Sequence, residues 1–223
     1  MAVCVSFADM NASVREMLGF HAVFFTLALP LAALLRDAAL GHALLALAIA
    51  YNLLLPAFGV MRGHSSWLRL WAFLLPLSCT QVLPDWALAR YAQTLIFPDH
   101  GIPRIGGLVP VYFMGLWIML LFPVLLWADA MRSRYLSAFV LALALFTLWE
   151  WLAPALHLWQ PQGVRTISGV ALYPLIPEAL LAFAALWTYR QTRELNYVQQ
   201  VFGAISVSAF YAGTLFFALL LMG

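Results

Sequence analysis

Lysine is absent from this chain of 223 residues, in which arginine supplies all eleven basic side chains. The absence excludes a retinal-type chromophore bound as a Schiff base, which needs a membrane lysine. Charge of either sign is scarce: 9% of the residues are charged and the net charge is +2. A chain so poor in basic residues offers no patch for a polyanion. We therefore expect no nucleic-acid partner.

The sequence also lacks the motifs of several enzyme classes. Its two cysteines, Cys4 and Cys79, support neither a disulfide nor a cysteine-based metal site. The five histidines are scattered, without the spacing of a zinc or di-iron centre. No aspartate-rich cluster is present to hold magnesium and a diphosphate, and no nucleophile elbow or Walker motif occurs. We expect no metal and no cofactor.

Apolar residues are what the chain has in excess. They make up 65% of it, and the mean hydropathy is +0.93. Soluble domains are roughly half apolar and about a quarter charged, and a soluble fold of this length could not bury so much apolar surface. The first residues lack the basic start of a signal peptide. We expect a multi-pass protein of a bacterial inner or plasma membrane, in contact with membrane lipid.

Seven segments are long and apolar enough to span a bilayer, which takes roughly 20 residues. The chain is therefore expected to be all-α, a polytopic bundle of seven transmembrane helices forming a single transmembrane domain over residues 1–223. Ser13 and Glu16 have the spacing of a capping box that would open the first helix. The expected helices cover residues 14–35, 39–60, 66–83, 108–128, 134–153, 168–189 and 199–222.

The arginines predict the orientation of this bundle. Seven of them lie at the N-terminus and in the loops on its side, against four on the opposite side. Because cytoplasmic loops are enriched in basic residues, we expect the N-terminus in the cytoplasm and the C-terminus outside. The two outer loops at 83–107 and 153–167 are long and rich in proline, glycine and aromatics. Long connections of this kind often act as lids or binding elements.

Two glutamates inside expected helices are the first candidates for chemistry. A charge at membrane depth costs about 2.5–3.5 kcal/mol, so such a side chain normally faces a partner or a cavity. Counting the helical rise of about 1.5 Å per residue, Glu150 falls near the outer end of its helix and Glu178 near the middle of the next. Adjacent antiparallel helices could bring both carboxyl groups to one cavity.

Each glutamate also has a purely structural interpretation. Pro174 and Pro177 precede Glu178, and the pair is equally consistent with a kinked helix whose glutamate binds a neighbouring helix. Glu150 lies between two tryptophans, which is typical of an interfacial aromatic belt. The same apolar setting would favour a proton-bearing carboxyl group, as either acid catalysis or a proton relay requires.

The loop at 83–107 adds polar candidates. Asp99, His100 and Arg104 could supply a second acid or bind a polar head group, or they could be ordinary turn residues. Asp85 ends a stripe with i, i+3, i+7 spacing that approaches the same outer mouth. The other members of this stripe are Ser78 and Gln81.

Aromatic side chains are expected around the same outer half of the bundle. A ring face stabilises a nearby cation by about 0.5–2 kcal/mol, so such rings could shield a carbocation. Aromatics also collect at membrane interfaces without any such role. The candidate substrate-binding rings are those of Tyr112, Trp117, Trp149 and Tyr173.

Two stretches carry a resemblance to known proteins. The chain resembles a family of small seven-helix integral membrane proteins of unassigned function. The resemblance lies in the stretch FPDHGIPRIGGLVPVYFMGLW and in the later stretch GVALYPLIPEALL. The size and isolated carboxylates are more distantly similar to integral-membrane terpene and carotenoid cyclases. The segment IPEALLAF resembles the acidic Pro-Glu motif of membrane lycopene cyclases, which has a second acidic residue where Ala179 stands here. This resemblance implies an acid role for Glu178 alone.

The sequence thus favours an intramembrane, acid-catalysed isoprenoid cyclase or hydratase acting on a lipid-soluble substrate. Glu178 would be the general acid, and Glu150 or Asp99 would take the proton that ends the reaction. Two alternatives remain open. One is a small proton-coupled carrier in which Glu178 binds the proton and a proline-broken helix moves. The other is a non-catalytic membrane subunit or assembly factor whose loops bind a partner.

Overall fold

The computed structural model describes residues 11–223, and these are all-α apart from three short two-stranded pairings. Four helices, α1, α2, α6 and α8, are long and apolar enough to cross a membrane, which indicates a membrane protein. Cys4 lies outside the described residues, and Cys79 is a free thiol. The long helices are α1 (Ala12–Leu34), α2 (Asp37–Met61), α3 (Ser65–Thr80), α5 (Phe113–Asp129), α6 (Arg134–Ala155), α7 (Leu175–Thr192) and α8 (Tyr197–Met222).

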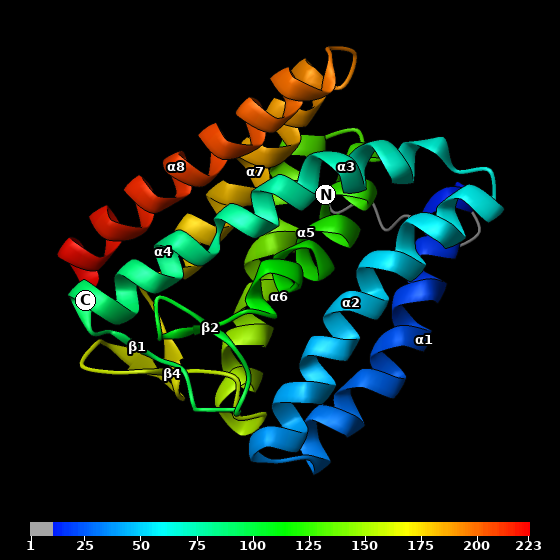
Figure 1. Ribbon diagram of the computed structural model, residues 1–223. Helices are drawn as coiled ribbons and strands as arrows, with labels where there is room; N and C mark the ends of the chain where they lie inside the picture. Colours follow the sequence, from blue (N-terminus) through cyan, green and yellow to red (C-terminus); the bar gives the residue numbers. More distant parts are fainter. Residues whose placement is uncertain (1–10) are drawn as a thin grey trace.

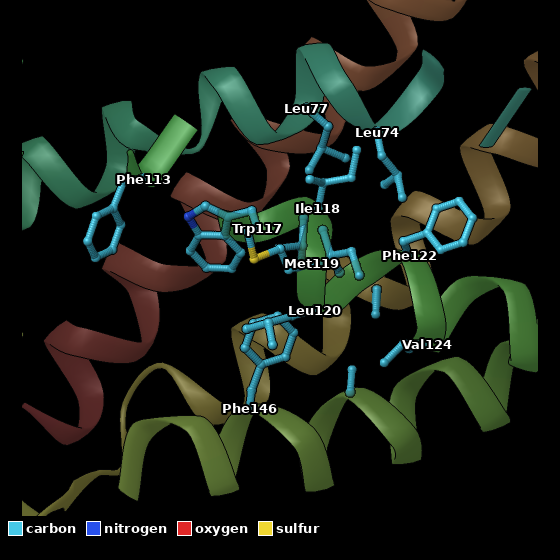
Figure 2. Close-up of a cluster of buried hydrophobic side chains, with 14 of the residues drawn as sticks. Leu74, Leu77, Phe113, Trp117, Ile118, Met119, Leu120, Phe122, Val124 and Phe146 are labelled. Atoms are coloured by element: carbon cyan, nitrogen blue, oxygen red, sulfur yellow. The ribbon is translucent and has the colours of Figure 1, made fainter. Parts of the chain in front are cut away.

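Helix α5 forms the centre of the bundle. The α1–α2 pair lies on one side of it and the α7–α8 pair on the other (Figure 1). A helix that is apolar on every face is stable when surrounded by other elements, and α5 has ten buried residues among its seventeen. Figure 2 shows Leu77 of α3 pointing toward Ile118 of α5 and Leu74 toward Phe122, with Phe146 of α6 on the opposite side.

The third helical segment is longer than expected. After Gln81, the short helix α4 (Val82–Ala87) and the π-helix η2 (Leu88–Ala92) extend α3 in nearly the same direction (Figure 1). Asp85 therefore lies on a helix rather than at the start of a loop, and it is buried. Ser78 of α3 donates to the Met114 carbonyl at 2.8 Å and fixes this segment against α5.

Two helices begin later than the sequence predicted, because hairpins occupy their expected first turns. Strands β2 (Arg104–Ile105) and β3 (Val109–Pro110) pair before α5, and β5 (Thr166–Ile167) and β6 (Val170–Ala171) pair before α7. The turns between them need positive φ, which Gly106, at +57°, supplies at low steric cost.

The late start of α7 changes the position of Glu178. The expectation that it lies near the middle of its helix is wrong, because it belongs to the first turn. Pro174 is the N-cap residue and Pro177 also lies in the first turn, where a backbone N–H has no intrahelical partner to lose. The two prolines therefore start the helix, and the predicted proline break within it does not occur.

The two long loops pair with each other at one end of the bundle. Strand β1 (Leu95–Ile96) runs antiparallel to β4 (Gln160–Pro161), with Leu95 opposite Pro161. The Gln162 N–H donates to the Thr94 carbonyl at 2.9 Å and extends the contact. In Figure 1 these strands lie at the lower left, below α4.

The start of α1 also differs from the prediction. Its N-cap is Asn11, whose side chain accepts from the Val14 N–H at 2.9 Å, so the capping box at Ser13 and Glu16 is wrong. Ser13 accepts instead from the Trp67 indole at 2.8 Å. Glu16 binds Arg62 at 2.7 Å, which joins α1 to the end of α2.

Candidate functional site

A cavity of about 50 Å³ lies where the paired loops meet the helix ends. Three acidic side chains from three different helices line it: Asp85 of α4, Glu150 of α6 and Glu178 of α7. All three are buried, with Glu178 only 4% exposed. The late start of α7 brings this about, since it places Glu178 in the helix turn nearest the paired loops.

Two of the three carboxyl groups are held by indole N–H donors. Trp117 Nε1 donates to Asp85 Oδ2 at 3.2 Å, and Trp159 Nε1 donates to Glu150 Oε1 at 3.2 Å. Glu178 differs, because its buried Oε2 has no hydrogen-bond partner among residues 11–223. An unpartnered buried oxygen is rare in a folded protein and calls for an explanation.

Within residues 11–223, the cavity acids also have no cationic partner. Every ion pair found in the described part of the chain involves Glu16, Asp129 or Glu194, all remote from the cavity lining. Buried charges are normally paired. Three carboxylates in one small apolar space would repel one another strongly.

Aromatic rings form most of the remaining wall. Trp117 lies against Phe146 and Tyr211, with ring centroids 5.5 Å apart in each pair. Phe113 meets Trp159 edge to face, also at 5.5 Å. The aromatic residues that line the cavity are Phe113, Trp117, Phe146, Trp149, Trp159, Tyr173 and Tyr211.

Tyr173 enters this wall from the segment just before α7. Its hydroxyl lies 3.5 Å from Thr94 Oγ1, which connects the two long loops over the cavity. Burial raises the pKa of the Tyr173 phenol, and the hydrogen bond with Thr94 opposes this only in part. Tyr173 therefore keeps its phenolic proton at neutral pH.

The other candidates from the loop at 83–107 do not line this cavity. Asp99 is exposed, and its Oδ1 accepts from the Gly101 N–H at 2.9 Å, as in a turn. Arg104 donates to the carbonyls of Phe97 and Leu108 and holds the loop in shape. Among the predicted site residues, Asp85, Glu150, Glu178, Trp117, Trp149 and Tyr173 share the cavity, and Asp99, His100, Arg104 and Tyr112 lie outside its lining.

His100 and Tyr112 form a separate buried pair. His100 Nδ1 lies 3.0 Å from the Tyr112 hydroxyl, and a methyl group built on Gly41 would come within 2.3 Å of the His100 carbonyl. Burial lowers the pKa of His100 and raises that of Tyr112. The pair docks the loop against α2.

Several lining residues were not predicted as site residues. Trp159, Phe113, Phe146 and Tyr211 are aromatic residues in an aromatic-rich chain, and nothing in the sequence separates them from interface aromatics. Only the fold shows that Trp159, nine residues after Glu150, turns back to contact it. Within residues 11–223, no group of three His, Cys, Asp or Glu side chains has a geometry that could hold a metal ion.

Comparison with known proteins places most of the chain in one family. A family model described as a domain of unknown function (DUF6989) matches residues 82–222, which is more than half of the chain. The chain therefore belongs to this family. The matched region begins just before Asp85 and so includes all three cavity acids. Searches of curated proteins and of solved structures found no match.

Proposed function

We propose that this member of the DUF6989 family is a membrane enzyme that cyclises or hydrates a lipid-soluble isoprenoid by acid catalysis. One observation carries the proposal: Asp85, Glu150 and Glu178 converge on a single aromatic-lined cavity, and none of them has a cationic partner among residues 11–223. A buried carboxylic acid beside aromatic faces suits the formation of a carbocation from an alkene or an epoxide.

The hydrogen bonds suggest a division of labour among the acids. Glu178 has no donor on its buried oxygen, so it is the best candidate to hold the transferable proton. The Glu178 O–H would form a C–H bond with an alkene carbon, leaving a carbocation and a Glu178 carboxylate. A second double bond of the same chain then closes a ring by attacking the cation.

The reaction ends when a carboxylate removes a proton from the carbon next to the new cation. Asp85 and Glu150 are the candidates for this base, since an indole N–H stabilises the anionic form of each. The proton removed returns to Glu178 through the cavity, so the product is an isomer of the substrate. If water attacks the cation instead, the product is an alcohol and the same base accepts the proton that water releases.

We further propose that seven helices span the membrane, with the N-terminus in the cytoplasm. Helices α3, α5 and α7 are shorter than the four clearest candidates, but α4 lengthens α3, and α5 is enclosed by the others. The arginine distribution supports the orientation. The cavity and the paired loops then lie toward the outer face.

The carrier and subunit alternatives have less support. A carrier needs a moving element, and the two prolines that could have provided one lie at the first turn of α7, where they do not break it. Burying three acids without cationic partners lowers the stability of the fold. A non-catalytic subunit would have no physical reason to keep them in one cavity.

The experiment that tests this proposal compares Glu178→Gln with the wild-type protein in phosphatidylcholine nanodiscs. Linear polyprenyl alkenes, alcohols and terminal epoxides of several lengths serve as substrates, and products are separated by mass spectrometry. We expect Glu178→Gln to lose at least 100-fold in turnover while it unfolds at a temperature close to that of the wild type. General acids typically contribute 10²–10⁴-fold to rate.

Glu194→Gln is the matched control. Glu194 is exposed just after the C-terminal end of α7, and its one ion pair within residues 11–223 is with its neighbour Arg193. The control should retain full turnover. Full turnover by Glu178→Gln would exclude Glu178 as the acid.

A further inference from the structure

The acid cavity is too small for an isoprenoid substrate. A volume of about 50 Å³ holds about three to five water molecules, at roughly 10–15 Å³ of accessible space for each. An isoprenoid chain must therefore lie mostly elsewhere, and only its reacting carbons can approach the acids. This consequence depends on the proposed function.

A much larger apolar groove lies next to the cavity. Its volume is about 510 Å³, and it runs between α1 and α6 with α5 as its floor. On α1 it extends from Leu18 to Leu29, and on α6 from Leu141 to Leu152. Each span is twelve residues, about 16 Å along the helix axis. The shape is a slot for one extended hydrocarbon chain.

His21 is the histidine that lines the groove, and it offers the groove no free hydrogen-bond donor. Nδ1 of this residue lies 2.8 Å from the Met17 carbonyl, which can only accept, so Nδ1 carries the proton. Nε2 then accepts from the Tyr51 hydroxyl at 2.7 Å. Both ring nitrogens are thus occupied, and the groove suits a hydrocarbon better than a polar head group.

A thin wall separates the groove from the acid cavity. Trp149 and Leu120 line both spaces. Trp149 precedes Glu150 on α6, and its ring contacts Phe25 of α1 edge to face, with centroids 6.3 Å apart. Trp117 and Trp159 are tied to cavity acids, but no hydrogen bond of the Trp149 indole is found in residues 11–223. A change of the Trp149 rotamer would therefore break no hydrogen bond.

We propose that the groove between α1, α5 and α6 binds the hydrocarbon chain of the isoprenoid substrate and that Trp149 is the gate through which its reacting end reaches the acids. The substrate enters sideways from the lipid. Moving the Trp149 ring joins the two spaces and gives the double bond or epoxide access to Glu178. The hairpins at the outer end stay closed, which keeps bulk water from the cation.

Photolabelling tests this proposal without requiring turnover. The probe is geranylgeraniol with a diazirine at the end of its chain, added to the full-length protein in phosphatidylcholine nanodiscs. We expect saturable labelling of α1, α5 and α6 groove residues. Unlabelled geranylgeraniol should displace the probe, and added phospholipid should not. Labelling that phospholipid displaces equally well, or labelling spread over the lipid-facing surface, would overturn the assignment.

Filling the groove provides the matched variants. Ala144 lines the groove, is exposed and lies outside the cavity, so Ala144→Phe should cut labelling at least tenfold. Leu148→Trp is a second block at an exposed position. Ala209→Phe places the same bulk on the exposed face of α8 and should leave labelling unchanged. Equal labelling of all three folded variants would contradict the proposal.

The gate has its own readout. Trp149→Ala should raise labelling of the cavity residues Tyr173 and Tyr211 severalfold, because the probe end can then pass the wall. Unchanged labelling there would exclude Trp149 as the gate. Glu178→Gln should still bind the probe while losing turnover. Labelling tests the binding of the hydrocarbon chain in the groove, and turnover tests acid catalysis by Glu178. The failure of either hypothesis can therefore be told from the failure of the other.

Discussion

Glu178 differs from the other two cavity acids in what surrounds it. Asp85 and Glu150 each accept an indole N–H, whereas the buried Oε2 of Glu178 has no partner in the described residues. Keeping such a group buried costs free energy that an apolar residue would not. A proton donor for a passing substrate is a physical reason for keeping it.

The contribution of each indole hydrogen bond to the free energy of unfolding should be measurable separately. Trp159→Phe keeps a ring against Phe113 but removes the N–H that reaches Glu150. We expect a loss of about 1–3 kcal/mol in the free energy of unfolding, because a buried carboxyl oxygen is left without its donor. Reversible unfolding in detergent measures the change.

A double-mutant cycle separates the hydrogen bond from lost packing. In the background of Glu150→Leu, which has no carboxyl oxygen, Trp159→Phe should cost clearly less. An equal cost in both backgrounds would mean that the indole contributes only its bulk.

Six of the ten residues that the sequence singled out line the cavity. Glu150 and Glu178 stand out because charges are rare in apolar helices, and Asp85 was found from its polar stripe. Asp99 is just as prominent in the sequence, yet it is an exposed turn residue. Local sequence does not say which loop carboxyl turns inward, since that depends on how the hairpins pack.

At the scale of elements, the length and apolar composition of segments predicted the seven long helices, with most ends within a few residues. The starts of α5 and α7 were missed, because residues 104–110 and 166–171 are apolar enough for a helix but form hairpins. Positive φ at Gly106 and Ser168 decides this. Ser168 and Gly169 form a dipeptide that is typical of turns, a signal that the expected helix start at residue 168 did not take into account.

The docking of the long loop on α2 depends on a glycine. A Cβ on Gly41 would come within 2.3 Å of the His100 backbone carbonyl, which cannot move away cheaply. We expect Gly41→Ala to lower stability by about 1–3 kcal/mol, as overpacking does. It should also speed hydrogen exchange of residues 94–105.

Gly19→Ala is the control for this change. Gly19 lies in α1, and a Cβ added to it would meet nothing within 4 Å, so alanine there should be neutral or stabilise the helix by about 0.5–1 kcal/mol. If Gly41→Ala behaves like Gly19→Ala, the loop is not seated on α2 as described.

The same loop should respond to acid. Burial holds the pKa of His100 below the 6.5 of an unperturbed histidine, so the folded loop prefers the neutral ring. This contribution to stability is complete above pH 6.5 and is lost as the pH falls through the folded-state pKa. Proteolysis within residues 94–112 should therefore accelerate between pH 7.5 and pH 5, and His100→Asn should weaken that dependence. Faster proteolysis of the loop as the pH rises would contradict the predicted direction of the pH dependence.

At the scale of the whole molecule, the bundle separates two kinds of polar chemistry. One end carries ion pairs, such as Glu16 with Arg62 and Asp129 with Arg190. The other end holds the unpaired acids under the joined loops. Composition predicted a membrane protein, but it could not predict that acids from three helices meet. That depends on packing between distant segments.

The most direct measurement of the central claim follows the proton itself. The wild-type protein is incubated in deuterated water with a polyprenyl compound that it converts. The product is then analysed by mass spectrometry and NMR. The account predicts a cyclic product with one non-exchangeable deuterium at the carbon that received the proton, and no such product from Glu178→Gln. A product free of carbon-bound deuterium, or the same labelled product from Glu178→Gln at the wild-type rate, would contradict it.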